Sequence, residues 1–254
     1  MRSEQIFHYQ RQDGKTLRGL FLPGEGALLV FLSGFRSTHW GGKAQGVANY
    51  AAEQGHACLR FDYIGHGNSD GPFEAFRISE AMQNTVACIA SVVRADQPVY
   101  LIGSSMGGWI ALEILRRGLP DAEGIDAQGL LLIAPAVNFL SEVIGNAEEK
   151  THLAMRRNGY IDIPDHYHQG ESYRITRAFV DDALTSETPP GEIILPCPVS
   201  IIHGTKDDSV PVERSHTLAA RIPNSGLHII EGGNHRLTDH IEDILGLLET
   251  QIEA

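Results

Sequence analysis

Cysteine is scarce in this sequence, and it contains neither a basic cluster nor a long apolar run. The three cysteines, Cys58, Cys88 and Cys197, stand far apart in apolar stretches. Their odd number and wide spacing favour buried free thiols in a reducing compartment over a disulfide framework or a metal site. No run approaches the roughly 18 apolar residues of a membrane span, and no apolar signal-peptide core follows the first methionine. We therefore expect a cytoplasmic protein without a membrane span.

Positive charge is also in short supply, since 20 Lys and Arg face 32 Asp and Glu and give a net charge of −12. The longest basic tracts are two pairs, Arg116-Arg117 and Arg156-Arg157. Nucleic acids and anionic membrane surfaces select clustered Lys and Arg, so neither is an expected partner. With 42% hydrophobic and 20% charged residues, the 254-residue chain has the composition of a globular domain.

Short apolar strands alternate with amphipathic helices along most of the chain. The expected strands are residues 6–10, 16–22, 27–32, 57–61, 99–102, 130–134, 199–203 and 227–230. The expected helices are residues 43–54, 79–94, 106–117, 212–221 and 238–253. This alternation predicts the α/β class, with a mostly parallel sheet covered by helices on both faces.

The alternation fails between residues 136 and 190, a stretch richer in charge, His and Tyr. Short helices are expected there at 142–150, 152–157 and 172–183. An insertion of this length inside a compact domain is usually functional or disordered. We therefore expect a core formed by residues 1–135 and 191–254, with a cap formed by residues 136–190. Apolar cap side chains such as Phe139 and Phe179 predict a preference for medium or long acyl chains.

A G-x-S-x-G pentapeptide at residues 103–107 is the strongest chemical signal. An apolar strand precedes it and a helical stretch follows it, which is the context that a nucleophile elbow requires. Its glycines allow a sharp turn, and the central Ser105 can then occupy a strained backbone conformation above the sheet. Ser105 is the predicted nucleophile, and Ser104 is expected to be structural.

A serine hydroxyl needs a general base, and in proteins with this elbow the base comes last in the chain. The turn between the last expected strand and the last helix contains His235. The acid that orients this imidazole should follow the strand at 199–203, where Asp207 and Asp208 are both candidates.

Acyl transfer also needs hydrogen-bond donors for an oxyanion. The backbone N–H groups of Phe35, at the end of a central strand, and of Met106, after the nucleophile, are the candidates. The Gly65-His66-Gly67 stretch is a weak phosphate-binding signal, so we interpret it as scaffold. Residues 166–168, His-Tyr-His, lack Cys or carboxylate partners at ligand spacing, which argues against a metal site.

Together these motifs resemble the α/β-hydrolase superfamily over nearly the whole chain. Ser105, Asp207 and His235 follow that superfamily's order. In its H-G-x-x-D-x-x-V-P pattern, which occurs here at residues 203–211, the catalytic acid falls on Asp207. The resemblance therefore implies Asp207 rather than Asp208.

A narrower resemblance is to the mammalian mitochondrial palmitoyl-protein thioesterases of the α/β-hydrolase-domain-containing group, which also act as acyl-glucuronide esterases. Its fragments are residues 32–35, 42–44, 55–63, 68–71, 103–109, 206–208 and 235–236. It implies hydrolysis of acyl thioesters or esters, small or protein-linked, with no metal and no organic cofactor. We interpret the chain as a bacterial relative without a transit peptide.

Three functions follow from these patterns. The first is hydrolysis of acyl thioesters, including S-palmitoyl cysteine, and the alternative is a general carboxylesterase that also accepts acyl glucuronides. The third is a non-catalytic binding protein on a hydrolase scaffold, against which the complete set of Ser105, Asp207 and His235 argues. The oligomeric state stays open.

Overall fold

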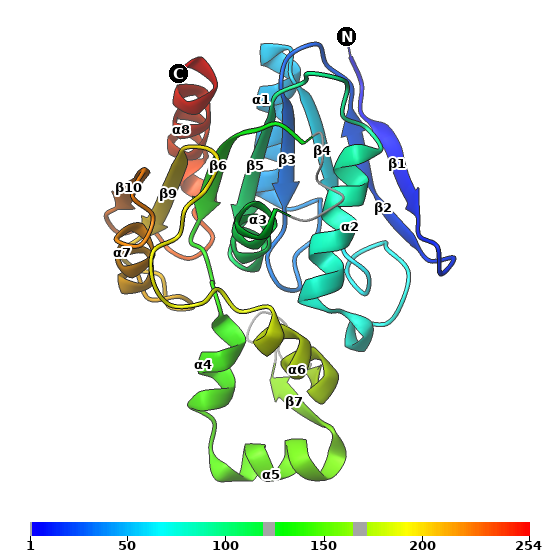
Figure 1. The fold of residues 1–254 in the computed structure, drawn as a ribbon, viewed down its shortest axis with the longest axis vertical. Helices are drawn as coiled ribbons and strands as arrows, with labels where there is room; N and C mark the ends of the chain where they lie inside the picture. Colours follow the sequence, from blue (N-terminus) through cyan, green and yellow to red (C-terminus); the bar gives the residue numbers. More distant parts are fainter. Residues whose placement is uncertain (1, 119–124, 165–171) are drawn as a thin grey trace.

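The computed structural model describes residues 2–118, 125–164 and 172–254 (Figure 1). Its centre is an eight-stranded sheet in the order β1-β2-β4-β3-β5-β6-β9-β10. The strands are β1 Gln5–Gln10, β2 Thr16–Leu22, β3 Leu28–Leu32, β4 Ala57–Phe61, β5 Val99–Ser104, β6 Ala127–Ile133, β9 Val199–Gly204 and β10 Ser225–Ile230. Only the β1–β2 and β2–β4 pairs are antiparallel, so the predicted mostly parallel sheet is confirmed.

Helices cover both faces of this sheet (Figure 1). On one face, α1 (Gly42–Gln54) and α8 (Ile241–Glu253) pack over apolar side chains of β3, β5 and β6. On the other face, α2 (Ile78–Ala90) and α3 (Met106–Arg117) enclose the larger part of the core. The short α7 (Glu213–Ala219) lies beside β9 and β10. All five residues of β3 are buried, as expected for a central strand with helices on both sides.

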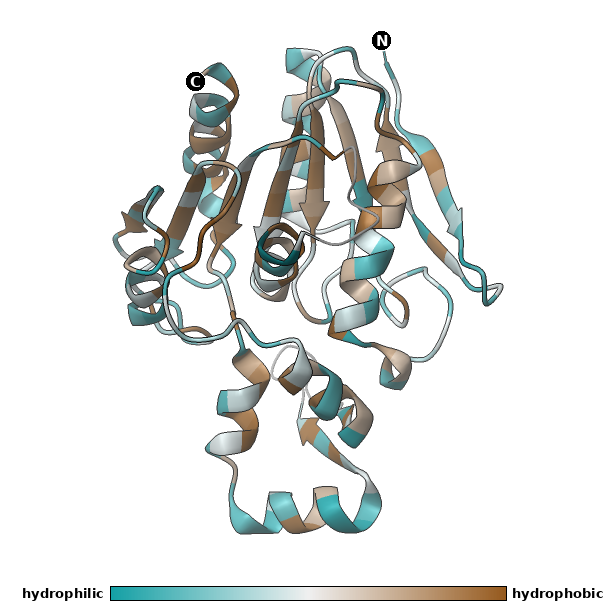
Figure 2. Ribbon diagram, viewed as in Figure 1, coloured by the Kyte–Doolittle hydropathy of each residue, from teal (hydrophilic) through white to brown (hydrophobic). Residues whose placement is uncertain are grey.

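Between β6 and β9 the chain forms a separate group of elements, which we call the insertion. It contains α4 (Phe139–Gly145), α5 (Glu149–Asn158), β7 (Tyr160–Pro164), β8 (Ser172–Thr176) and α6 (Arg177–Thr185). Figure 1 shows it beyond the carboxyl ends of the parallel strands. Figure 2 shows that apolar residues concentrate on the central strands, whereas α5, at the far end of the insertion, is mostly hydrophilic.

Two secondary-structure predictions in the insertion are wrong. The helix expected over 172–183 starts only at Arg177, because Ser172–Thr176 pairs antiparallel with Tyr160–Pro164. The Thr176 side chain then caps α6 by accepting a hydrogen bond from the N–H of Phe179. The helix expected over 142–150 is divided, since α4 ends at Gly145 and α5 begins at Glu149.

Aromatic and polar contacts attach the insertion to the core. The Phe179 ring is buried, stacks on Phe35 at a centroid distance of 5.8 Å and meets Phe76 edge-on at 5.3 Å. The Asp182 carboxylate accepts hydrogen bonds from the backbone N–H and the hydroxyl of Ser79 on α2. Phe179 is therefore an interface side chain that joins the insertion to the loop after β3.

All three cysteines are buried free thiols, as the sequence predicted. None of the described helices combines the length with the apolar composition that a membrane crossing requires.

Candidate active site

Ser105 lies at the sharp turn between β5, which ends at Ser104, and α3, which begins at Met106. Its backbone has φ 54° and ψ −119°, a conformation that non-glycine residues rarely adopt. The predicted strain at this residue is therefore present. Ser105 is partly exposed, whereas Ser104 is only 5% exposed.

Close packing explains why glycines flank this turn. A Cβ atom at Gly103 would lie 2.5 Å from the Gly107 carbonyl oxygen. A Cβ atom at Gly107 would lie 2.1 Å from the carbonyl oxygen of Leu32 on β3. Both distances are far below a normal contact, so only glycine lets α3 approach the neighbouring strand this closely.

The structure brings His235 and Asp207 to Ser105 from two other loops. His235 Nε2 lies 3.2 Å from Ser105 Oγ, and His235 Nδ1 lies 2.7 Å from Asp207 Oδ2. Two consecutive hydrogen bonds through His235 therefore link the three side chains. Asp208, the other acid candidate, is exposed and accepts a 3.2 Å hydrogen bond from the Ser209 hydroxyl.

Asp207 is held as an ionised carboxylate. Its side chain is fully buried, and burial by itself raises a carboxyl pKa. Hydrogen bonds from His203, His235 and the Val210 N–H outweigh burial and keep the pKa of Asp207 below its ordinary value. An ionised carboxylate can only accept, so His235 Nδ1 must donate to it. His235 Nε2 is then left with a lone pair directed at the Ser105 hydroxyl.

His203 is a second histidine on the same carboxylate, and the sequence motifs did not point to this contact. Its Nε2 lies 2.9 Å from Asp207 Oδ2 and 2.9 Å from the Val210 carbonyl oxygen, so it carries the proton. Its Nδ1 lies 2.6 Å from Ser215 Oγ and accepts from that hydroxyl. The spacing of four residues between His203 and Asp207 is the sequence signal that could have revealed this contact.

The backbone of Gly34 lies against the serine. A Cβ atom at Gly34 would sit 3.2 Å from Ser105 Cβ and 3.7 Å from Ser105 Oγ. Met106 is the first residue of α3, so its N–H has no acceptor within the helix and lies at the positive end of the helix dipole. Phe35 directly follows Gly34, and Met106 directly follows Ser105, so both candidate amides belong to residues that adjoin this contact.

A buried aspartate fixes the loop that carries Phe35. Asp62 accepts hydrogen bonds from the His39 N–H at 2.8 Å, the His39 ring at 2.8 Å and the Asn68 N–H at 2.9 Å. Burial raises the pKa of Asp62, but these hydrogen bonds outweigh it and lower the pKa overall. The Asp62 loop is therefore scaffold, and it ties the chain after β3 to the chain after β4.

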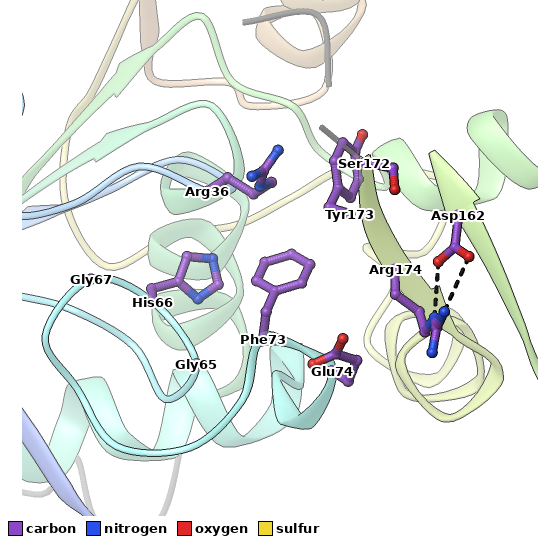
Figure 3. Close-up of a pocket in the computed structure, with 10 residues that line it drawn as sticks. All are labelled: Arg36, Gly65, His66, Gly67, Phe73, Glu74, Asp162, Ser172, Tyr173 and Arg174. Atoms are coloured by element: carbon purple, nitrogen blue, oxygen red, sulfur yellow. Dashed lines mark hydrogen bonds and ion pairs between the residues drawn. The ribbon is translucent and has the colours of Figure 1, made fainter. Parts of the chain in front are cut away.

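A cavity of about 520 Å³ opens between the β7–β8 hairpin and the loop after β4 (Figure 3). It is lined by Arg36, Gly65, His66, Gly67, Phe73, Glu74, Asp162, Ser172, Tyr173 and Arg174. Most of these side chains are polar or charged, and Figure 3 shows Arg174 paired with Asp162 at its rim.

This cavity is offset from the serine, because none of its lining residues is Ser105, Asp207 or His235. The Phe35 ring contacts two of the lining residues, with centroid distances of 5.2 Å to Phe73 and 5.6 Å to Tyr173. Phe35 therefore packs behind the cavity wall and directly follows Gly34, whose backbone lies near Ser105.

Among the described residues, no group of three or more His, Cys, Asp and Glu side chains could hold a metal ion. The His-Tyr-His stretch at 166–168 lies outside the described residues.

Residues 29–244 match the model of the alpha/beta hydrolase family. The mouse mitochondrial palmitoyl-protein thioesterase ABHD10 is 29% identical over 255 residues, covering 96% of this chain and 80% of that protein. The sequence motifs had predicted this likeness, and it is confirmed.

Solved structures show the same relationship. A structure from Agrobacterium vitis superposes with a TM-score of 0.90 at 29% identity and covers 99% of both chains. The structure of mouse ABHD10 superposes with a TM-score of 0.86 at 27% identity and covers 98% of both chains.

Proposed function

This chain belongs to the alpha/beta hydrolase family, and from that premise we propose that it cleaves acyl thioesters or esters through an acyl-enzyme on Ser105. The proposal rests on the hydrogen-bonded contacts that link Asp207, His235 and the Ser105 hydroxyl. His235 Nδ1 lies 2.7 Å from Asp207 Oδ2, and His235 Nε2 lies 3.2 Å from Ser105 Oγ. Side chains in this order can activate a serine that would otherwise be a poor nucleophile.

In the proposed cycle, His235 Nε2 removes the Ser105 proton while Oγ attacks the acyl carbonyl carbon. The resulting oxyanion accepts hydrogen bonds from the N–H groups of Phe35 and Met106. Protonated His235 then gives its proton to the leaving sulfur or oxygen as the bond from that atom to the acyl carbon breaks, which leaves an acyl-enzyme on Ser105. Water, deprotonated by the same His235, attacks the acyl carbon, and His235 returns the proton to Ser105 Oγ as the acid is released.

The catalytic acid in this proposal is Asp207. Its ionised carboxylate fixes the proton of His235 on Nδ1 and stabilises the imidazolium that forms during attack. His203 supports Asp207 from the other side, because its Nε2–H donates to the same oxygen. No step of the cycle draws on a metal or an organic cofactor.

We assign residues 136–190 to a cap over the strand ends, and residues 1–135 and 191–254 to the hydrolase core. The proposed substrate class is acyl thioesters, including S-palmitoyl cysteine on proteins. Support comes from the similarity to the mitochondrial palmitoyl-protein thioesterase over most of both chains. The acyl carbonyl would lie at Ser105, between the core and this cap.

The second candidate is an esterase for oxoesters with a polar alcohol group, such as acyl glucuronides. The polar lining of the cavity beside Phe35 favours it, because Arg36, Glu74 and Ser172 offer hydrogen bonds that a hydrocarbon chain does not use. Matched thioesters and oxoesters of the same acyl chain, compared by kcat/KM, separate the two candidates.

The activity itself is tested with two neighbouring serines. Ser105→Ala should abolish ester turnover and labelling by a fluorophosphonate probe while the protein stays folded. Ser104→Ala should retain most of both, because Ser104 is buried beside the turn. An inactive Ser104→Ala together with an active Ser105→Ala would refute the assignment. Failure of the wild type to label would favour a non-catalytic binding protein.

A further inference from the structure

Lys43 occupies a position that its own helix does not favour. It is the second residue of α1 (Gly42–Gln54), whose first turn contains no acidic residue. A cation in the first turn faces the positive end of the helix dipole. Lys43 is also half-buried, and loss of solvation lowers its pKa to about 8. Both the position in the helix dipole and the loss of solvation oppose folding, so a favourable contact outside the helix must offset them.

That contact is on the loop that carries His235. Lys43 Nζ donates a 2.6 Å hydrogen bond to the backbone carbonyl of Arg236, the residue that follows His235. The charges that act on the ammonium are Asp207, on the loop after β9, which raises its pKa, and Arg236, on the loop after β10, which lowers it. Lys43 is therefore bonded to the residue that follows His235, and the charge of Asp207 acts on its ammonium.

The start of α1 also packs directly against the chain that follows His235. A Cβ atom at Gly42 would lie 3.2 Å from Thr238 Cγ2, and a Cβ atom at Gly46 would lie 2.6 Å from Ile241 Cδ1. On the other side, the Lys206 N–H donates to the Gly233 carbonyl at 2.8 Å. The His235 loop is thus held between the Asp207 loop and α1.

We propose that Lys43 is a positioning residue, which holds the loop at residues 232–237 so that His235 stays aligned between Asp207 and Ser105. This inference rests on the proposed function, since it assigns His235 the role of general base. Lys43 acts through the backbone of Arg236 and touches no reacting atom. Its ammonium is the stronger donor, because a charged donor forms a stronger hydrogen bond than the neutral amine.

The inference predicts a kinetic signature for Lys43→Met. The value of kcat should fall about 10-fold, the scale of one weakened charge-assisted hydrogen bond, whereas KM should stay within about twofold because Lys43 does not contact substrate. In the wild type, kcat should decline as pH rises through about 8, where the ammonium loses its proton. This decline should be absent in Lys43→Met and should move to higher pH in Lys43→Arg, which keeps its charge.

The experiment measures kcat, KM and their pH profiles for wild type, Lys43→Met, Lys43→Arg and a matched control. The control is Lys15→Met, which removes a partly exposed lysine, paired with Asp13, from the β1–β2 turn and should leave every profile unchanged. Partial rescue by Lys43→Arg supports positioning. A Lys43→Met enzyme with unchanged kcat and an unchanged alkaline limb overturns the inference.

An NMR experiment tests the role of Lys43 independently of the proposed hydrolase activity. The imidazole proton between His235 Nδ1 and Asp207 should give a downfield resonance in the wild type that broadens in Lys43→Met. This comparison needs no turnover. A wild type without hydrolysis but with a Lys43-dependent resonance would refute only the proposed function, whereas an identical resonance in both proteins would refute the role of Lys43.

Discussion

Replacing Asp207 by asparagine should inactivate the enzyme through the proton on His235. The Oδ1 atom of Asp207 accepts the N–H groups of Ser209 and Val210 at 2.9 and 2.8 Å. An asparagine oxygen can keep those two bonds. Its amide nitrogen then faces the histidines, where the native Oδ2 accepts at 2.9 Å from His203 and at 2.7 Å from His235.

Because an amide nitrogen donates, His235 Nδ1 can no longer carry a proton at this contact. The proton must move to Nε2, which faces Ser105 Oγ, and the imidazole then cannot accept the serine proton. In serine proteases the equivalent change lowers kcat by about 10⁴, and we expect a loss of that order for Asp207→Asn.

Stability should respond with a defined pH dependence. The folded-state pKa of Asp207 lies below its ordinary value of 3.8, so the carboxylate stabilises the fold above that pH and less as pH falls through the folded pKa. Asp207→Asn should lower the free energy of unfolding at pH 7 by roughly 1–3 kcal/mol, the scale of one charge-assisted hydrogen bond. The deficit should shrink below about pH 4.

The assay is single-turnover ester hydrolysis together with urea unfolding, and Asp208→Asn is the control. Asp208 is exposed, so its variant should stay within about 0.5 kcal/mol and about twofold of wild type. Equal and mild effects of the two substitutions on kcat would show that Asp207 does not orient His235.

Three further changes test other parts of the account. The pKa of Lys43 is lowered from 10.5 to about 8, so between these pH values the unfolded chain binds one more proton than the folded protein. In urea melts, the free energy of unfolding of the wild type should therefore rise by up to about 3 kcal/mol relative to that of Lys43→Met across this range. Parallel curves would contradict the burial of this ammonium. Gly34→Ala should lower kcat at least 10-fold with little loss of stability, because its methyl group would crowd Ser105. For comparison, losing one oxyanion-hole donor lowers kcat by about 10²–10³. In wild type, kcat/KM should rise with acyl chain length, by about 0.8 kcal/mol for each buried methylene. Phe179→Ala should flatten that rise and cost about 3–5 kcal/mol of stability; a destabilised variant with an unchanged chain-length profile would restrict Phe179 to joining the insertion to the core.

Local signals were enough to predict most of the core. The strands Thr16–Leu22 and Ala57–Phe61 and the helix Met106–Arg117 have the predicted bounds, since each is an apolar or periodic run that turn residues delimit. The helix expected to reach residue 94 ends at Ala90 instead. Apolar spacing continues beyond its end because Val92 and Val93 still pack against the core from a tighter turn.

The β7–β8 hairpin could not be predicted in the same way. Its strands have only five residues each and are stabilised by pairs such as Ile161 with Ile175, which are distant in sequence. The short Ser172–Thr176 stretch does not by itself identify its partner strand. Its preference for a strand arises from pairing, which a local pattern does not contain.

In the candidate site too, local motifs predicted some residues, whereas contacts made by the tertiary fold could not be predicted. The positions of Ser105, Asp207 and His235 follow from motifs at strand ends, and the structure brings these side chains together. The contacts of His203 and Lys43 depend on which loops meet across the fold. Lys43 lies in residues 42–44, one of the fragments that carry the family resemblance, but the residue that it bonds, Arg236, is 193 positions away in the sequence.

The acyl-enzyme on Ser105 is the central claim, and peptide mapping after rapid quench tests it most directly. A slowly deacylating ester is mixed with the enzyme, the reaction is stopped in acid within the pre-steady-state burst, and the peptide that contains residues 103–117 is analysed by mass spectrometry. The mass of the acyl group should appear on Ser105 in the wild type. Turnover without any acylated Ser105, or an acyl group on another residue at the same rate, would contradict it.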